Sequence, residues 1–423
     1  MRIVVYPHDL GLGGSQLNAI ELGAAVQALG HEVILFGQPG PLVRRAKELG
    51  LDYVQAPVPG KRPSPAVIRA LGRLARERGV DIIHGYEWPP VLECLAASKI
   101  AGSTAVATVM SMAVAPFIPY SMPLMVGTEQ IRRYEEKAGR GTVRLMEPPV
   151  DTAANSPDAD PATRAFRERW GLADAAMHVV CVSRLAHELK LEGILAAMDA
   201  VMDLSRAGEV RLVVVGSGPA EATVRDRAKQ INAEAGRTVV VLTGEIADPR
   251  PAYEVADVVL GMGGSALRGM AFAKPLVVQG EEGFWELLTP ESLPTFLWQG
   301  WYGTGPGSSG RGSRALAAIL ARLLDDQGLR NALGSYGRRL VVERFSLQHS
   351  AQRQLDLYKE VSGAPKRQVA LAQAEATALA RYAAYVARRR WLRLRGKAAL
   401  DDFNSRPLAS SPVPAWNPAE VRP

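Results

Sequence analysis

Short apolar runs alternate with helical patterns along the first part of the chain. Strands that are apolar throughout and alternate with helices are typical of a parallel sheet covered on both faces. The pattern therefore predicts a doubly wound domain in residues 1–150. Its strand candidates are RIVVY (2–6), VILFG (33–37), DIIHG (81–85), TAVATVM (104–110) and PLMVG (123–127).

The same alternation restarts near residue 178 and predicts a second doubly wound domain in residues 151–345. Residues 147–164, between the two halves, are rich in Pro, Asp and Ala and indicate a linker. Ser346 is a suitable N-cap for a closing helix over 346–365. The strand candidates of the second domain are HVVCVS (178–183), RLVVVG (211–216), TVVVLTG (238–244), ADVVLG (256–261) and PLVVQ (275–279).

The net charge of +7 arises in the C-terminal tail. Residues 366–397 contain nine Lys or Arg and one acid, so the rest of the chain is close to neutral and no nucleic-acid partner is expected. This segment mixes arginines with Tyr382, Trp391 and Leu392, which favours a basic amphipathic helix on an anionic membrane surface. A solvated helix that packs on its own domain is the alternative. Residues 398–423 are expected to be disordered.

The composition favours a cytoplasmic protein. No stretch approaches the roughly 20 apolar residues of a membrane span, and the N-terminus lacks the apolar run of a signal peptide. Cys94 and Cys181 lie in apolar surroundings, which indicates a reducing compartment rather than a disulfide framework. The membrane hypothesis for the tail places the protein at the inner membrane face.

Two glycine-rich turns each follow an apolar strand and open a helix. The first contains Gly13 and Gly14, and the second contains Gly263, Gly264 and Ser265. Such a turn leaves backbone N–H groups at the positive end of a helix dipole, which suits a phosphate. A tight turn without a ligand is the alternative.

Other glycine and acid motifs argue against cofactor, metal or triad chemistry. The first turn does not keep the G-x-G-x-x-G spacing, and Phe36-Gly37-Gln38-Pro39 provides no acid for a dinucleotide ribose. Asp158-Ala159-Asp160 lies in the linker rather than at a strand end, and the six histidines show no metal-ligand spacing. The sequence contains no G-x-S-x-G. We expect neither a cofactor nor a metal.

Two cations follow the first strand of the second half. Arg184 comes directly after the strand, and Lys190 follows six residues later. The guanidinium fork of arginine and the point charge of lysine both suit a diphosphate, while ordinary surface charge is the alternative. The next strand ends in a turn that contains Gly216 and Gly218, which is a weak signal by itself.

Seven segments, taken in order, resemble retaining glycosyltransferases of family 4 with the GT-B fold, over roughly residues 1–362. That fold consists of two Rossmann-like domains with a cleft between them and a C-terminal helix that crosses back to the first. The segments are GLGGSQLNAIELGAAVQALGHEVILF (11–36), DIIHGYEWPP (81–90), PPVDTAANSP (148–157), VSRLAHELKLEGILAAMDAV (182–201), VVVGSGP (213–219), AYEVADVVL (252–260) with MAFAKPLVV (270–278), and RFSLQHSAQRQLDLYKEV (344–361).

The resemblance implies a nucleoside-diphosphate sugar as co-substrate, an acceptor of unspecified kind and no metal. It implies that Arg184 and Lys190 stabilise the departing diphosphate. On the acceptor side it points to His8, His84 and Glu87. The donor contacts that it implies are Gly13, Gly14, Gly216, Gly218, Gly244, Gly263, Gly264, Ser265, Arg268, Glu281 and Glu282.

The chain departs from the family pattern at two places. Arg268 stands where the family has the second Glu of its Glu-x7-Glu element, and a glycine turn replaces the first. Met110-Ser111-Met112 lies where the family has a donor-contacting His. Arg268 is either a further phosphate contact or part of a structural ion pair. A GT-B protein that binds without transferring, or a nucleotide-sugar epimerase, is the alternative function.

Overall fold

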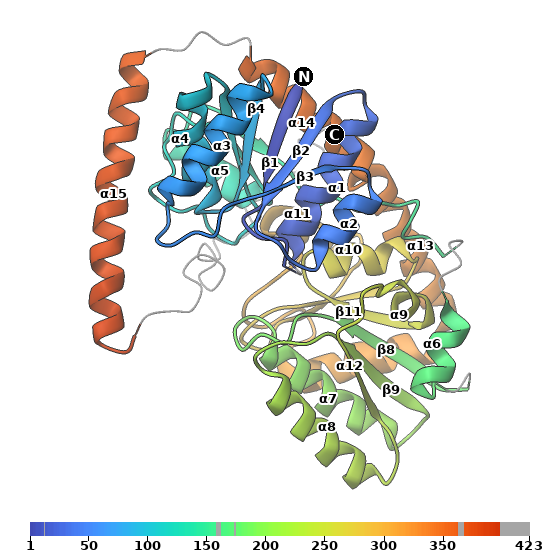
Figure 1. Cartoon of the computed structure of the whole chain (residues 1–423). Helices are drawn as coiled ribbons and strands as arrows, with labels where there is room; N and C mark the ends of the chain where they lie inside the picture. Colours follow the sequence, from blue (N-terminus) through green and yellow to red (C-terminus); the bar gives the residue numbers. More distant parts are fainter. Residues whose placement is uncertain (12, 158–161, 173–174, 363–367, 398–423) are drawn as a thin grey trace. The chain divides into compact units, whose positions relative to one another are not determined.

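A computed structural model describes residues 1–11, 13–157, 162–172, 175–362 and 368–397. The chain divides into two compact units. Unit 1 consists of Met1–Pro149 together with the two helices that follow Leu347, and unit 2 consists of Val150–Ser346 (Figure 1). The predicted tail 398–423 and the Asp158-Ala159-Asp160 motif lie outside the described residues.

Unit 1 contains a seven-stranded sheet in the order β3-β2-β1-β4-β5-β6-β7, and every neighbouring pair is parallel. Its strands are β1 (Arg2–Tyr6), β2 (Glu32–Gly37), β3 (Asp52–Gln55), β4 (Ile82–Tyr86), β5 (Thr104–Val109), β6 (Leu124–Val126) and β7 (Val143–Leu145). Its helices are α1 (Gly14–Ala28), α2 (Leu42–Glu48), α3 (Pro65–Glu77), α4 (Pro90–Ala101), α5 (Glu129–Lys137), α14 (Leu347–Ser362) and α15 (Gln368–Leu394).

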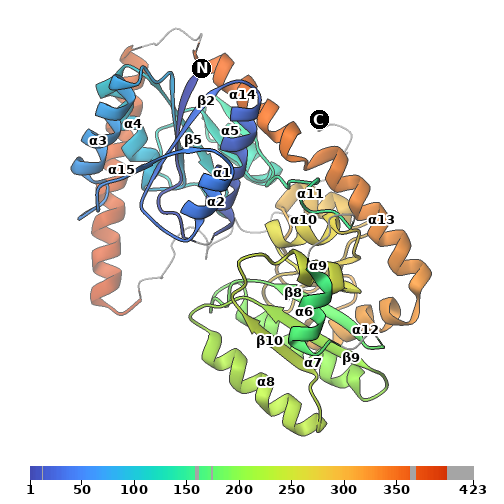
Figure 2. The ribbon, with the colours of Figure 1, turned by 45° about the vertical axis from the view of Figure 1, so that its right-hand side comes forward.

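Helices cover both faces of this sheet because its strands are apolar on both sides. α14 packs against α1, and its apolar residues join the core beneath that helix (Figures 1 and 2). α3 and α4 pack together, and both contribute to a second apolar core of the unit. Two helix starts have side-chain caps: the Ser64 hydroxyl caps α3, and the Thr128 hydroxyl caps α5.

Unit 2 contains a six-stranded sheet in the order β10-β9-β8-β11-β12-β13. Its strands are β8 (Met177–Val182), β9 (Val210–Val215), β10 (Val240–Gly244), β11 (Val258–Gly261), β12 (Leu276–Gln279) and β13 (Trp285–Leu287). Its helices are α6 (Thr163–Trp170), α7 (Leu191–Ser205), α8 (Glu221–Ala235), α9 (Arg250–Val255), α10 (Gly264–Ala271), α11 (Leu293–Gln299), α12 (Gly312–Asp325) and α13 (Gln327–Arg344).

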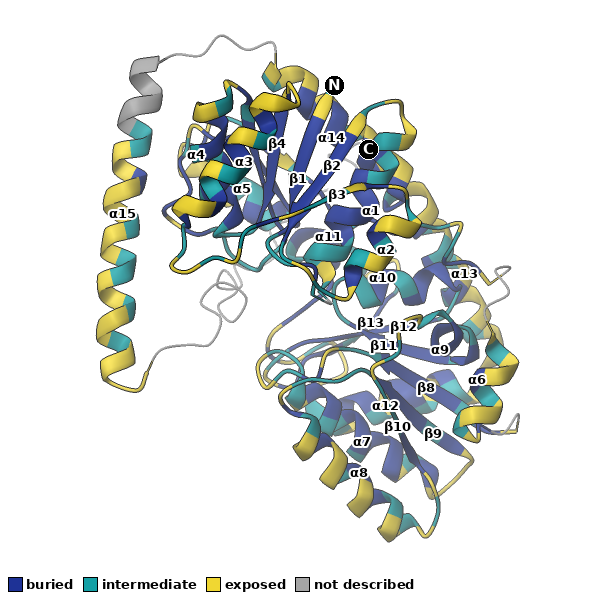
Figure 3. Cartoon of the chain, in the orientation of Figure 1, coloured by how far each residue is buried: buried dark blue, intermediate teal, exposed yellow. Residues whose placement is uncertain are grey.

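The prediction of an α/β fold with two doubly wound sheets is confirmed. Both sheets place their first strand beside their fourth, which is the crossover of a Rossmann-like domain. The central strands are buried in both units (Figure 3). One strand departs from the parallel pattern, since β13 runs antiparallel to β12 and closes one edge of the unit 2 sheet. No helix in the described ranges is long and apolar enough to span a membrane.

Candidate functional site

Three loops meet at the carboxyl edge of the unit 2 sheet, because β8, β11 and β12 are neighbouring parallel strands. The loop after β8 carries Arg184 and leads to Lys190, which caps α7. The loop after β11 is the glycine turn before α10. The Lys190 ammonium lies 2.6 Å from the Sδ of Met262 in that turn, and the charge of Arg184 acts on Lys190. The structure therefore brings Lys190 to the glycine turn and places Arg184 in the loop after β8 at the same edge of the sheet.

Lys190 lies in a poorly solvated position. Desolvation lowers the pKa of its ammonium to about 8, while the smaller effects of Cys181 and Arg184 oppose each other. At neutral pH the group is still mainly protonated. A poorly hydrated ammonium attracts an anion more strongly than a hydrated one. The Arg184 side chain, by contrast, is exposed and can approach a ligand from solvent.

The glycine turn offers fewer donors than its sequence predicts. Gly263 has a φ of 58°, a left-handed conformation that favours glycine, and its N–H donates to the Trp301 carbonyl at 2.8 Å. The Ser265 hydroxyl donates to the Met262 carbonyl at 3.0 Å. The amides of Gly264 and Ser265 have no acceptor within the described part of the chain. The Gly263 amide, which was expected to face an anion, is therefore engaged within unit 2, and the amides of Gly264 and Ser265 are the available donors.

Arg268 lies one turn into α10 and reaches back toward the start of that helix. Its Nη1 is 3.3 Å from the position that a Cβ would take on Gly264. Its charge also acts on Tyr253, where it opposes the increase in the pKa of the phenol that burial causes. A third cation therefore lies beside the two available amides.

The glycines after β9 and β10 hold the Arg184 loop in place. A Cβ on Gly216 would lie 2.0 Å from the Ser183 carbonyl oxygen, and one on Gly218 would lie 2.5 Å from that of Leu185. The Gly216 amide donates to the Gly244 carbonyl at 2.9 Å. These glycines permit a close approach of two backbones, so the amide of Gly216 is not available to a donor molecule.

Glu281 and Glu282 follow β12 but differ in their surroundings. Both carboxylate oxygens of Glu281 are engaged: Oε1 accepts from the Leu189 amide at 3.2 Å, and Oε2 accepts from the Tyr302 hydroxyl at 2.6 Å. The Glu282 side chain is exposed. Sugar hydroxyls would therefore have to compete with Leu189 and Tyr302 for the Glu281 carboxylate, whereas the Glu282 side chain faces solvent.

Glu192 completes a reciprocal clamp between the two loops. Its carboxylate accepts from the amides of Glu282 at 3.0 Å and Gly283 at 2.6 Å. In return, Glu281 binds the amide of Leu189. Leu189 and Glu282 both have left-handed backbones, with φ of 67° and 54°. Sequence reasoning missed Glu192, because an acid in the first turn of a helix is a common feature and carries little signal.

In unit 1, Gly13 at the start of α1 is closely packed, but its backbone conformation is an ordinary one. Gly13 caps α1 with an extended φ of −154°. A Cβ on Gly13 would lie 2.2 Å from Oε1 of Gln16, whereas one on Gly14 would meet open space. Gly14 is therefore the more accessible of the two predicted donor contacts.

Glu87 connects this turn to the ends of β4 and β5. Its carboxylate accepts from the Ser15 hydroxyl at 3.1 Å, the Met110 amide at 2.7 Å and the Ser111 hydroxyl at 2.6 Å. Burial raises the pKa of Glu87, and the hydrogen bonds from Ser111, Met110 and Ser15 oppose that increase. Its φ of 59° is left-handed. Glu87 thus lies at the carboxyl edge of the sheet, where ligands bind in doubly wound folds.

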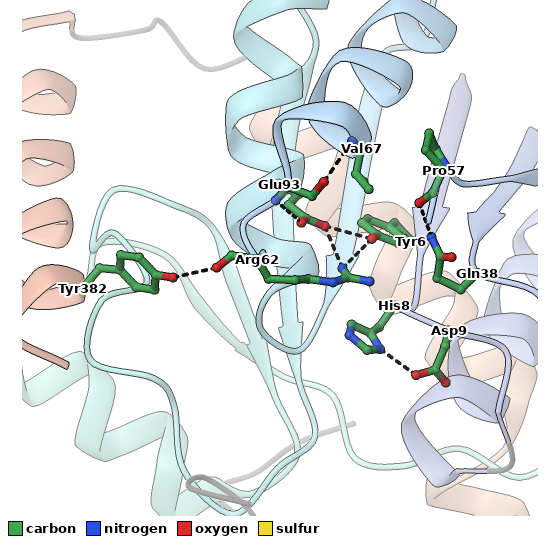
Figure 4. Close-up of polar contacts among 10 residues, drawn as sticks. Tyr6, His8, Asp9, Gln38, Pro57, Arg62, Val67, Glu93 and Tyr382 are labelled. Atoms are coloured by element: carbon green, nitrogen blue, oxygen red, sulfur yellow. Dashed lines mark hydrogen bonds and ion pairs between the residues drawn. The ribbon is translucent and has the colours of Figure 1, made fainter. Parts of the chain in front are cut away.

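The two histidines predicted on the acceptor side have different environments. His8 is partly exposed and pairs through Nδ1 with Asp9 at 2.7 Å, an interaction that lowers the pKa of Asp9 to about 2 (Figure 4). His84 is 0% exposed and hydrogen bonds Tyr358 at 2.6 Å and Thr108 at 2.7 Å. Burial lowers the pKa of His84 to about 3. His84 is therefore corrected to a neutral core residue beneath α14.

A metal site does not emerge within the described ranges, where no three His, Cys, Asp or Glu side chains gather as ligands would. The cations and amides of unit 2 can stabilise an anion directly, since they combine Lys, Arg and the start of a helix.

Two Rossmann-like domains in one chain are the architecture of the GT-B class of fold. Residues 13–201 match the glycosyl transferase 4-like domain, and residues 176–326 match glycosyl transferases group 1. A glycosyltransferase from Rickettsia africae shares the fold with a TM-score of 0.68 at 16% identity, over 86% of this chain and 99% of that one. Anabaena HepE in complex with UDP-glucose has a TM-score of 0.67 at 14% identity, over 85% and 100%.

Two curated relatives are similar in sequence to most of this chain. The 2-deoxystreptamine glucosyltransferase of Streptomyces kanamyceticus is 27% identical over 82% of this chain and 99% of its own length. A GDP-mannose-dependent monoacylated alpha-(1-6)-phosphatidylinositol monomannoside mannosyltransferase of Corynebacterium glutamicum is 24% identical over 73% and 84%. The chain belongs to the family 4 glycosyltransferases of the GT-B fold, and the predicted transferase class is confirmed.

Proposed function

We propose that this glycosyltransferase takes its sugar from a nucleoside-diphosphate sugar and transfers it with retention of the anomeric configuration. The observation that carries the proposal is the convergence of Arg184, Lys190 and the amides of Gly264 and Ser265 at one edge of unit 2. The UDP and UDP-glucose bound to Anabaena HepE support the same class of donor.

The proposed reaction breaks the bond between the anomeric carbon and the diphosphate oxygen and forms a bond from that carbon to an acceptor hydroxyl oxygen, whose proton passes to the departing diphosphate. Negative charge grows on the departing diphosphate while the sugar becomes oxocarbenium-like. Lys190 and Arg184 supply positive charge, and the two amides supply hydrogen bonds. One well-aimed donor of this kind contributes roughly 10² to 10³ in rate. The charge balance of the step then requires neither a cofactor nor a metal.

The direct test removes the two cations. Arg184→Ala with Lys190→Ala is expected to abolish donor turnover and to weaken UDP binding at least 100-fold by calorimetry, with little change in the melting temperature. The matched control is Arg206→Ala, which removes an exposed cation on the same unit that pairs with Asp203. UDP affinity equal to that of the control would contradict the proposal.

Two further measurements define the reaction. The anomeric configuration of the product, read by NMR, separates retention from inversion, and activity that persists in EDTA agrees with a reaction that needs no metal. Transfer or hydrolysis measured over a panel of nucleotide sugars separates an active enzyme from a protein that binds the donor without transferring it. The appearance of an epimerised nucleotide sugar would identify the epimerase alternative instead.

We propose a cytoplasmic site of action, on the basis of the two buried cysteines. The basic segment 366–397 supports peripheral contact with the inner membrane face. A cell fractionation that recovers the protein only from extracellular material would contradict both.

A further inference from the structure

One face of α15 is attached to unit 1 through aromatic side chains. The rings of Tyr382 and Tyr385 lie 5.2 and 4.9 Å from the ring of Phe117, and Tyr385 lies 5.6 Å from Trp88. The Tyr382 hydroxyl donates to the Arg62 carbonyl at 2.8 Å (Figure 4). This inward face therefore has a defined partner, and α15 is part of unit 1.

The opposite face of α15 is apolar and exposed. Leu379, Trp391 and Leu394 expose 70%, 49% and 89% of their surface. At 100° per residue, the apolar positions of this face span a sector of about 140°, on the side of the helix opposite Tyr382. Four exposed alanines continue the stripe: Ala380, Ala383, Ala384 and Ala387.

Arginines border this apolar stripe. Residues 388–397 contain six cations and no acid. Arg393 lies beyond one border of the stripe and Arg395 beyond the other, while Arg390 lies within it near Leu379. Arg395 stacks on the ring of Trp391 at 3.9 Å. An apolar stripe between cationic borders is the arrangement of a helix that lies in a membrane interface. A second copy of this face would bring like charges together, and a nucleic acid would leave Leu394 without an apolar partner.

We propose that α15 docks unit 1 on an anionic lipid surface, so that the acceptor is an amphiphile of that surface. The second part rests on the proposed transferase function. Trp88, which the inward face of α15 contacts, directly follows Glu87 at the carboxyl edge of the unit 1 sheet. Lipid head groups on the outward face would lie about one helix diameter, roughly 10 Å, from Trp88. An acceptor with its tail in the membrane and its head group in water matches this placement.

The docking is tested with the full chain and vesicles of phosphatidylglycerol in phosphatidylcholine. The variant combines Arg390→Gln, Arg393→Gln and Arg395→Gln, all at exposed positions. Because each cation strengthens binding about fivefold, the variant should partition into these vesicles roughly 100-fold more weakly. Leu394→Ser should weaken the binding that remains at high salt. The wild type and the variants should all bind vesicles of phosphatidylcholine alone more weakly than the wild type binds the anionic vesicles.

The matched control combines Arg164→Gln, Arg206→Gln and Arg225→Gln, which remove the same charge from exposed positions of unit 2. It should bind like the wild type. The docking proposal would be overturned if the α15 variant and this control bound the anionic vesicles equally well, or if the wild type did not bind them. It would also be overturned if the wild type bound a short oligonucleotide more tightly than the vesicles. Melting temperatures identify a variant that fails to fold.

Donor turnover is measured in the same samples, so the two proposals fail separately. Wild-type protein that hydrolyses a nucleotide sugar but ignores vesicles would refute the docking and leave the transferase function intact. Protein that binds vesicles but neither binds UDP nor turns over a donor would refute the function and leave the docking intact. Transfer to a detergent-free, water-soluble acceptor at the same rate with and without vesicles would refute the amphiphile as acceptor.

Discussion

Replacement of Glu192 by Ala tests whether the reciprocal clamp positions the donor site. The change removes the two hydrogen bonds that the carboxylate accepts from the amides of Glu282 and Gly283, and it leaves the bonds of Glu281 in place. Glu192 itself is exposed and lies two residues beyond Lys190, so it acts on the ligand only through the loops that it holds.

The magnitude follows from two opposing effects. The left-handed backbones of Leu189 and Glu282 cost about 1 kcal/mol or more each. Each hydrogen bond to the Glu192 carboxylate contributes about 1.5 kcal/mol, the lower end for charged acceptors because the group is exposed. The bonds and the strain are therefore of similar size. Loss of the two hydrogen bonds, partly offset by hydrogen bonds to water, should destabilise this arrangement of the loops by about 2 kcal/mol. That corresponds to a decrease of roughly 30-fold in kcat/KM for the donor.

The assay is donor turnover at varied nucleotide-sugar concentration, with urea unfolding as the stability measurement. Glu192→Gln keeps one acceptor oxygen and should fall between the wild type and Glu192→Ala. The matched control is Glu221→Ala, which removes a partly exposed acid that pairs with Arg225 at the start of the neighbouring helix α8. If kcat/KM of Glu192→Ala equals that of the control, or falls only in proportion to global stability, the clamp does not position the site.

Three further predictions concern unit 2. UDP affinity should fall as the pH rises through about 8, because the Lys190 pKa is lowered to about 8 and only the ammonium attracts the diphosphate. Lys190→Arg should remove this decrease. The same shift should raise the free energy of unfolding between pH 8 and 10, where the unfolded chain still binds that proton; a decrease in this window would contradict it. Gly216→Ala should lower the free energy of unfolding by about 3 kcal/mol in urea titrations, since its Cβ would lie 2.0 Å from a carbonyl oxygen. Gly236→Ala, also left-handed but with open space around it, should cost about 1 kcal/mol, and equal costs would refute the steric argument.

The sequence by itself determined the fold class and the general place of the anion site. Apolar strands that alternate with helices form parallel sheets, and parallel strands bring their carboxyl ends to one edge. Arg184, Lys190 and the turn at Gly264 therefore had to lie near one another. The short strands at Asp52–Gln55 and Val143–Leu145, and the antiparallel Trp285–Leu287, escaped the pattern because three or four residues give little periodicity.

Only the tertiary structure decided which hydrogen-bonding groups remain available to a ligand. The Gly263 amide binds Trp301, and Glu281 binds Tyr302, so partners distant in sequence occupy groups that local sequence leaves open. His84 is a core residue because Tyr358 covers it from more than 250 residues away. Periodicity along a chain predicts which face of an element is apolar. Hydrogen-bond partners and burial depend instead on contacts between distant segments, and only the folded chain specifies them.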